Sequence, residues 1–210
     1  MERQYQALPI RELGEGAGFR RPTQARPVRV GLESPALAAM TDLLLTSPAT
    51  IRPHAPLDGA NAFMIARGVR LLLVVDEREA VLGVVTASDI LGEKPVQIAM
   101  ERGMKHDELT VADVMAPAGN VEVLSLSDVE GARVGHVLET LRRAGRQHAL
   151  VVDHDIVPAK GPLDRQLQRS MVRGIFSLSQ IARQLGLALQ TGGEVARTFS
   201  EIEGALGRSA

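Results

Sequence analysis

The strongest constraint on the fold of this chain is a series of sequence features that occurs twice. Val74-Val75-Asp76 in the first half has a counterpart in Val151-Val152-Asp153, 77 residues further along (Asp76 to Asp153). A glycine followed three residues later by Thr or Ser occurs in Gly83-Val84-Val85-Thr86 and, more weakly, in Gly174-Ile175-Phe176-Ser177. This step is typical of a buried strand that runs into a helix. An internal repeat of this kind predicts two copies of one supersecondary unit.

Each copy follows the same order of expected elements. The segments expected in the first half are a short helix opened by Ser34-Pro35 and continuing to Leu44, a strand at 49–51, a helix that ends at Gly68, strands at 71–75 and 81–85, and a helix opened by Thr86. The matching segments of the second half begin at Thr110 and include a strand at 121–124 and a helix that ends at Gly145. The short turn between the two apolar strands predicts a hairpin. The sequence therefore indicates an α/β (α+β) fold with two β-α-β-β-α repeats.

These patterns divide the chain into four parts. The expected parts are an extended N-terminal arm (1–33), repeat 1 with its connecting helix (34–105), repeat 2 (106–189) and a C-terminal amphipathic helix or tail (190–210). Repeat 2 is longer between its last two strands, and the Pro, Gly and basic residues of this insertion, at about 155–171, predict a loop outside the core. The terminal stripe of Val195, Phe199, Ile202 and Leu206 packs either on a second subunit or on its own domain.

Composition excludes several classes of protein. The 24 Lys and Arg residues nearly balance the 25 Asp and Glu residues, which argues against a surface built to hold nucleic acid or an anionic membrane. Aromatic residues make up only 2% of the chain, so base-stacking platforms are not expected. No apolar run approaches the ~18 residues of a membrane span, cysteine is absent, and Met1 to Tyr5 lacks a secretory pattern. We expect a cytoplasmic protein that does not enter a membrane.

Catalytic and metal-binding patterns are also missing from the sequence. The five histidines, which are His54, His106, His136, His148 and His154, show no paired spacing of the kind that binds a metal. The sequence contains no hydrolase, Walker or dinucleotide-binding motif in a suitable context. We therefore predict that the protein is not an enzyme and holds no metal.

The repeated series resembles a known family. The segments that carry the resemblance are Ala39-Met40-Thr41-Asp42, Val111-Ala112-Asp113-Val114-Met115, residues 68–76 and the two strand-to-helix steps. Together they resemble a tandem pair of cystathionine-beta-synthase-type (CBS) domains, often called a Bateman module. The resemblance implies two repeats packed with pseudo-twofold symmetry, clefts that take adenine nucleotides or S-adenosylmethionine, and a homodimer that passes the signal to a protein effector.

The resemblance also suggests which residues bind the ligand. A carboxylate can accept hydrogen bonds from two ribose hydroxyls, and a helix start favours a phosphate, so Asp89 and Thr86 are the central candidates. The remaining candidates are Thr50 and Ile51 for the base, Arg70 for the phosphate, and Ser177, Gln180 and His148 in the second cleft. No cofactor is required, and AMP, ADP, ATP or S-adenosylmethionine would be a regulatory ligand. Gln180 is a poorer ribose acceptor than Asp89.

Two other interpretations remain open from the sequence. Thr86 with Asp89, and Ser177 with Gln180, have the spacing of a helix capping box, so helix capping alone explains both pairs. The alternative for the whole chain is a structural dimerisation module whose clefts stay empty. Ligand binding and capping do not exclude each other, because one side chain can do both.

Overall fold

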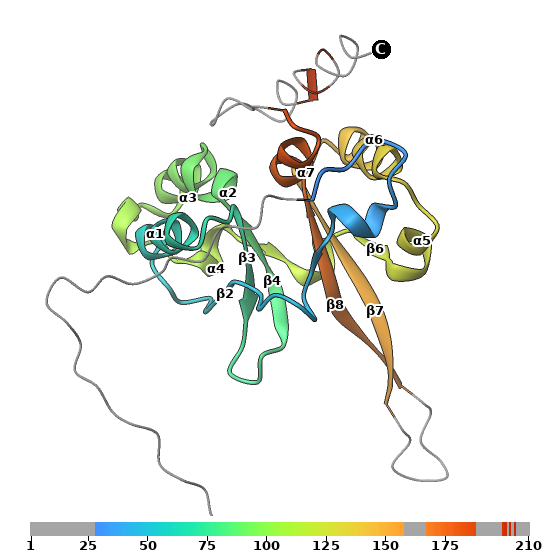
Figure 1. The fold of residues 1–210 in the computed structure, drawn as a ribbon. Helices are drawn as coiled ribbons and strands as arrows, with labels where there is room; N and C mark the ends of the chain where they lie inside the picture. The colour runs from blue at the N-terminus through green and yellow to red at the C-terminus, as the bar shows by residue number, and fades with distance from the viewer. Residues whose placement is uncertain (1–27, 158–166, 188–198, 201, 203, 205–210) are drawn as a thin grey trace, which may run out of the picture.

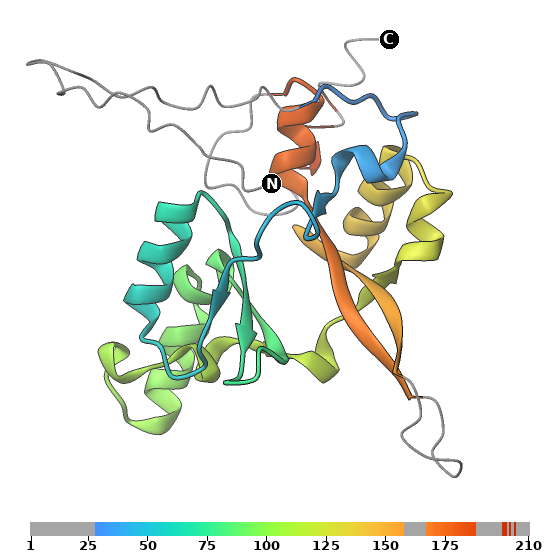
Figure 2. The ribbon, with the colours of Figure 1, turned by 60° about the horizontal axis from the view of Figure 1, so that its bottom comes forward.

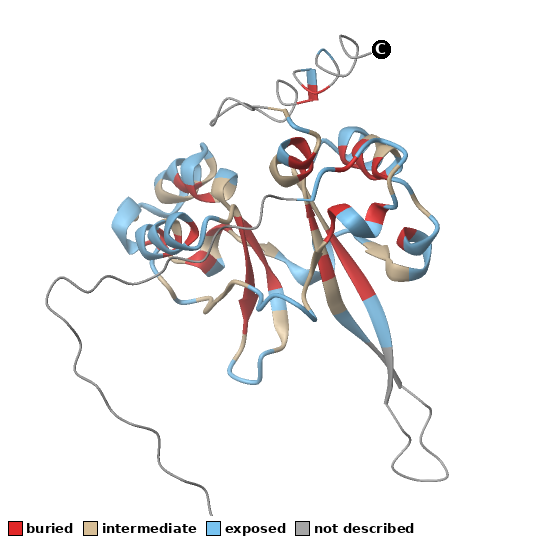
Figure 3. Cartoon of the chain, viewed as in Figure 1, coloured by how far each residue is buried: buried red, intermediate tan, exposed pale blue. Residues whose placement is uncertain are grey.

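The protein forms two α/β units that lie side by side (Figure 1). The computed structural model describes residues 28–157, 167–187, 199, 200, 202 and 204. Each unit contains a four-stranded sheet with helices against it, and buried residues gather on the inner strands and on the helix faces that meet them (Figure 3). The fold class predicted from the sequence is therefore confirmed.

The helices and strands follow the predicted order. The first unit contains β2 (Thr50–Ile51), α1 (Leu57–Arg67), β3 (Leu71–Val75), β4 (Val81–Thr86), α2 (Ala87–Leu91) and α3 (Lys94–Arg102). The second contains β6 (Val123–Ser125), α5 (Leu126–Glu130), α6 (Val134–Ala144), β7 (His148–Val157), β8 (Leu167–Ser177) and α7 (Leu178–Gln184). Short elements precede each unit in the chain. Before the first unit lie η1 (Ala36–Ala39) and β1 (Thr41–Asp42). Before the second unit lie η2 (His106–Glu108), α4 (Val111–Val114), β5 (Ala116–Pro117) and η3 (Ala118–Asn120). None of the described helices is long and apolar enough to cross a membrane.

The two sheets have the same topology. The strand orders are β2-β3-β4-β5 and β6-β7-β8-β1, each with one parallel pair followed by two antiparallel pairs. Even the register irregularity is repeated, between Val74 and Val75 in β3 and between Val151 and Val152 in β7. Gly68 and Gly145, with φ of 65° and 62°, cap α1 and α6 in the left-handed conformation that glycine adopts without strain.

The two halves of the chain exchange their edge strands. β1, which precedes the first unit, pairs with β8 of the second unit, and β5 from the second half pairs with β4 of the first unit. An Arg173 Nη2 on β8 donates to Asp42 Oδ2 at 3.0 Å and holds β1 in place. The adjoining short helices follow their strands, since η1 packs in the second core and α4 in the first. Each sheet is therefore completed by the other half of the chain.

The first short helix differs from its prediction. Only Ala36–Ala39 is helical, as a 3-10 turn, and Leu44 is 76% exposed. Ser34 does not cap this turn, because its Oγ accepts a hydrogen bond from Gly31 N at 2.9 Å. The pairing of Thr41 with Ile175 requires extended backbone where the sequence favoured helix, so tertiary pairing overrides local preference.

The ends and the insertion also require corrections. The end of the predicted extended arm packs on the second unit, where Val30 is 9% exposed and donates its backbone N–H to Gln184 O at 3.1 Å. Residues 167–170 of the predicted loop belong to β8 and pair with 154–157 of β7, so the hairpin extends past the body (Figure 2). Phe199 and Ile202 are buried in the second core, so this part of the predicted stripe packs on its own domain. Residues 1–27, Val195 and Leu206 lie outside the described residues.

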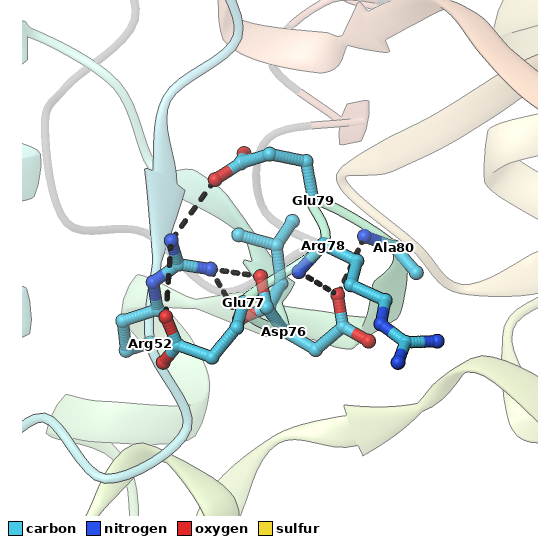
Figure 4. A network of polar contacts seen from close by, with 7 residues as sticks. Arg52, Asp76, Glu77, Arg78, Glu79 and Ala80 are labelled. Atoms are coloured by element: carbon cyan, nitrogen blue, oxygen red, sulfur yellow. Dashed lines mark hydrogen bonds and ion pairs between the residues drawn. The ribbon is translucent and has the colours of Figure 1, made fainter.

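One arginine fixes the β3–β4 turn to β2. Arg52 Nη1 donates to the carbonyls of Val75, at 3.3 Å, and Asp76, and its Nη2 lies 3.0 Å from Glu79 Oε1 (Figure 4). Asp76 Oδ1 accepts from the backbone N–H groups of Ala80 and Arg78 at 2.8 and 2.9 Å. The Ala80 hydrogen bond is the main reason that the pKa of Asp76 lies below its ordinary value. The predicted hairpin is thus present and braced at its turn.

Candidate functional site

Two clefts lie where the units meet, one at the start of α2 and one at the start of α7. The smaller cleft, of about 270 Å³, is lined by the polar residues Arg70, Thr86, Ser88, Asp89, Asn120, Glu122, Arg146, Gln147 and His148. The larger cleft, of about 640 Å³, is lined by the polar residues Thr41, Thr46, Ser47, Arg67, Arg70, His148, Ser177, Ser179, Gln180 and Arg183. Arg70 and His148 line both clefts, which follows from their place between the two sheets.

In the smaller cleft, Thr86 and Asp89 form the capping box that their spacing predicted. Asp89 Oδ2 accepts from Thr86 N at 2.9 Å and lies 2.5 Å from Thr86 Oγ1, which in turn accepts from Asp89 N at 3.3 Å. The second carboxylate oxygen, Oδ1, lies 3.8 Å from Lys94 Nζ, and the Asp89 side chain is 25% exposed. One oxygen of Asp89 therefore caps α2, while the other remains able to accept a hydrogen bond.

The opposite wall of the smaller cleft comes from the second half of the chain. Glu122 precedes β6 and Arg146 follows α6, and Arg146 Nη2 lies 3.2 Å from Glu122 Oε2. With Arg70 and Asp89, these residues give the cleft two guanidinium groups and two carboxylates, so its formal charges cancel. Sequence reasoning missed this wall. The 77-residue offset could have pointed to Arg146 and Gln147, because it relates them to Val69 and Arg70, but it does not reach Glu122.

His148 is the first residue of β7 and lies beside Arg70 between the two clefts. Burial, helped by the nearby Arg70 guanidinium, lowers the pKa of His148 to about 4. The imidazole is therefore neutral at pH 7, with one nitrogen able to donate and the other to accept a hydrogen bond.

This pKa shift predicts how stability depends on pH. Between the folded pKa of about 4 and the ordinary value of 6.5, the unfolded state binds more protons than the folded state. Stability should be fully present above pH 6.5 and fall as the pH drops towards 4, by at most about 1.4 kcal/mol per pH unit. Urea unfolding across this range measures the slope. His148→Gln should flatten it, whereas the exposed His54→Gln should keep it; an unchanged slope in His148→Gln would contradict the assignment.

Two carboxylates with lowered pKa values affect stability at lower pH than His148 does. The pKa of Asp42 is lowered chiefly by its hydrogen bond from Arg173, and that of Asp113 chiefly by the Thr110 backbone N–H. Because these pKa values lie below the ordinary 3.8, their contribution to stability is lost progressively as the pH falls below about 5. The histidine slope is therefore measured between about pH 5 and 6.5, above the range of the carboxylates.

The predicted capping box at α7 is wrong. Ser177 makes no capping hydrogen bond, and its Oγ lies 3.0 Å from Ser179 Oγ. Gln180 Oε1 instead accepts from Thr41 Oγ1 at 3.0 Å. The exchanged strand β1 brings Thr41 next to α7, so a contact across 139 residues replaces the local one. The two side chains still line the larger cleft.

Thr50 and Ile51 were predicted to line a ligand cleft with Thr86 and Asp89. In the structure they do not line that cleft. Thr50 lines a third cavity, of about 520 Å³, with Val75 and Arg173, and Ile51 packs on the core of the first unit. The segment before β2 lines the larger cleft instead, and the segment before β6 lines the smaller one. Among the eight candidates, the structure therefore brings Arg70, Thr86, Asp89 and His148 together in one cleft, and Arg70, His148, Ser177 and Gln180 in the other. Within the described ranges, no group of three or more His, Asp and Glu side chains is placed to hold a metal ion.

Part of the chain matches a known family model, and the fold is similar to that of several solved structures. The family model of the CBS domain matches residues 40–96. No curated protein matches the chain in sequence. An uncharacterized conserved protein from Pyrococcus horikoshii is similar in fold, with a TM-score of 0.50 and 20% identity over 78% of this chain and 100% of that one. At this identity the likeness concerns the fold alone.

Two other solved structures show weaker likeness. CBSX2 in complex with AMP, a protein from Arabidopsis thaliana, has a TM-score of 0.45 and 19% identity over 71% of this chain and 94% of its own. The CBS domain pair of MJ0100, in complex with 5-methylthioadenosine and S-adenosyl-L-methionine, has a TM-score of 0.45 and 21% identity over 71% of this chain and 98% of its own.

Proposed function

We propose that this chain, a tandem pair of CBS domains, is a regulatory module that senses an adenosyl compound or adenine nucleotide in its smaller cleft. The observation that carries the proposal is the state of Asp89, whose Oδ2 caps α2 while Oδ1 has Lys94 Nζ at 3.8 Å as its nearest ionic partner. A carboxylate oxygen at the edge of a cleft that can still accept a hydrogen bond is the acceptor that a ribose hydroxyl requires.

The other groups of the smaller cleft suit the nucleoside part of such a ligand. Its volume of about 270 Å³ lies just below the usual range for small-molecule pockets, so a nucleoside fits better than a triphosphate. The neutral imidazole of His148 and the amide of Gln147 offer donors and acceptors for a base. Because the charges of the cleft cancel, an uncharged or cationic adenosyl group can enter without a net electrostatic cost.

The test compares Asp89 with a matched carboxylate. Thr110 and Asp113 form the same capping box as Thr86 and Asp89, but Asp113 lines neither cleft. Thermal unfolding with adenosine, AMP, ADP, ATP or S-adenosylmethionine should show stabilisation of ~2.7 kcal/mol at a hundred times the dissociation constant. Asp89→Asn should weaken binding about tenfold, because a hydrogen bond to a charged group is lost, and Asp113→Asn should not. Equal affinity in the two variants would remove Asp89 from the site.

A second candidate function is a structural dimerisation module. The observation that favours it is a set of exposed apolar side chains on α1, α2 and α3, namely Ile65, Leu91, Val96 and Met100, with exposed fractions of 53% to 80%. Exposed apolar side chains of this kind suit a homodimer contact, through which the proposed signal would also pass to an effector in the cytoplasm. Light scattering with and without ligand separates the two functions. A dimer that no adenosyl ligand stabilises would favour the structural role.

A further inference from the structure

The third cavity, of about 520 Å³, takes no part in the functions proposed above. It lies between the β3–β4 hairpin, which supplies Val75 and Val81, and the projecting β7–β8 hairpin, which supplies Asp153 and Met171 (Figure 2). Most of its lining residues line neither of the two clefts. The cavity is therefore a separate surface to which both units contribute.

The walls of this cavity are mostly apolar. The apolar lining residues are Leu43, Leu44, Pro48, Leu73, Val75, Val81, Met171 and Val172. Leu44 and Met171 are 76% and 41% exposed, so part of this apolar surface is open to water. The volume lies within the usual range of sites that bind another molecule. An apolar group that entered the cavity would remove this surface from water, which is favourable.

Carboxylates outnumber free cations at the rim of the cavity. Arg173 is neutralised by the ion pair that holds β1 in place. Arg52 is shared by two carboxylates of the β3–β4 turn, with its Nη2 3.0 Å from Glu79 Oε1 and 4.0 Å from Glu77 Oε2 (Figure 4). Asp153 has no cationic partner among the residues that the structure describes. The rim therefore favours a cationic group.

The N-terminal segment of this chain, residues 1–27, has the complementary chemistry. It contains three glutamates, which are Glu2, Glu12 and Glu15, and five arginines, which are Arg3, Arg11, Arg20, Arg21 and Arg26. In Phe19-Arg20-Arg21, a large apolar side chain is followed directly by two cations. The apolar walls of the cavity suit the first of these side chains, and the carboxylates at its rim suit the other two.

Chain length permits this contact. Val28 is the first residue that the structure describes, and the hydrogen bond from Val30 N to Gln184 O fixes this end of the described chain on the second unit. The stretch from Phe19 to Val28 can span up to about 30 Å. A compact body of this size has a radius of gyration of about 15 Å. Phe19 can therefore reach surfaces on either unit.

We propose that the third cavity binds the N-terminal segment of the same chain, with the Phe19 ring between its apolar walls. The two arginines that follow then lie at the rim, where they pair with Glu79 and Asp153. Since the two hairpins belong to different units, the bound segment ties the units together at a surface separate from the ligand clefts. It also covers the apolar side chains that are exposed at the mouth of the cavity.

Paramagnetic relaxation measured by NMR on the full chain tests this contact. Because the chain contains no cysteine, Ala17→Cys gives a single attachment point for a nitroxide close to Phe19. At low ionic strength, where charge attraction is least screened, the amides of Val75, Val81 and Val172 should lose most of their intensity relative to the reduced nitroxide. The amides of α3 and α5 should keep theirs. Phe19→Ala in the labelled chain should restore most of the lost intensity, because the apolar part of the contact is removed.

The rim is tested by Glu79→Gln/Asp153→Asn, which should also restore the intensity. Its matched control is Glu101→Gln/Glu130→Gln, since both of these carboxylates are exposed and line none of the three cavities. The control should keep the loss, and the positions of the amide signals show in each variant that the fold is kept.

The proposal would be overturned if the amides at the third cavity lost no intensity, or if the loss remained in Phe19→Ala or in the rim variant. Chains that carry the nitroxide are also mixed with isotope-labelled chains that do not. An equal loss of intensity in this mixture would assign the contact to a second copy and overturn the proposal as well.

Discussion

Replacement of Leu109 with alanine is expected to lower the free energy of unfolding by about 2–5 kcal/mol, the usual range for a fully buried leucine. Leu109 is 1% exposed and packs in the core of the first unit with Leu72 and Val85, although it belongs to the second half of the sequence. The stability should therefore be lost mainly in the first unit. Urea unfolding gives the total change, and native-state hydrogen exchange of the amides in β3 and β4 gives its location.

Met40 provides the mirror-image control. It belongs to the first half of the sequence but is 8% exposed in the core of the second unit. Met40→Ala should weaken protection of the β7 and β8 amides at least as much as that of β3 and β4. If Leu109→Ala instead weakened β7 and β8 while β3 and β4 kept their protection, the exchange of segments between the units would be wrong.

Replacement of Gly83 with alanine should destabilise the protein by about 1–3 kcal/mol, towards the upper end of the range for overpacking. A β-carbon at Gly83 would overlap the carbonyl oxygen of Ala116 and lie 3.1 Å from Pro117 Cα. These are backbone atoms of the exchanged strand β5, so relief requires the strand to move away from β4. The pairing of Val84 with Ala116 would be strained as well.

Gly174 is the counterpart of Gly83. A comparison of the two alanine variants distinguishes a clash with strand backbone from a clash with a side chain. The three nearest atoms to a β-carbon at Gly174 all belong to the side chain of Met40, which is unbranched and can change its conformation. Gly174→Ala should therefore cost less than Gly83→Ala, because a side chain can move aside more easily than the backbone of a paired strand. Chemical unfolding of both variants measures the difference in the free energy of unfolding. If Gly174→Ala lost as much stability as Gly83→Ala or more, the close approach of strand β5 would not be the reason for the glycine at position 83.

Local signals in the sequence determined most of the repeated architecture. The apolar run at 71–75, the short turn after it and the left-handed glycines at 68 and 145 each depend on a few neighbouring residues, and all have the predicted structure. The same holds for the capping box of Thr86 and Asp89. These features are set by side-chain periodicity and by backbone conformation over about one turn of chain, which a sequence displays directly.

The tertiary structure alone decided how the two copies complete each other. β1 and β5 are two residues long and carry no periodicity, so their partners are set by backbone hydrogen bonds to strands far away in the sequence. That exchange brings Thr41 to Gln180, and it carries the chain past β4 so that Glu122 lines the same cleft as Asp89. The residues that line either cleft therefore come from both halves, and no local pattern could assign them.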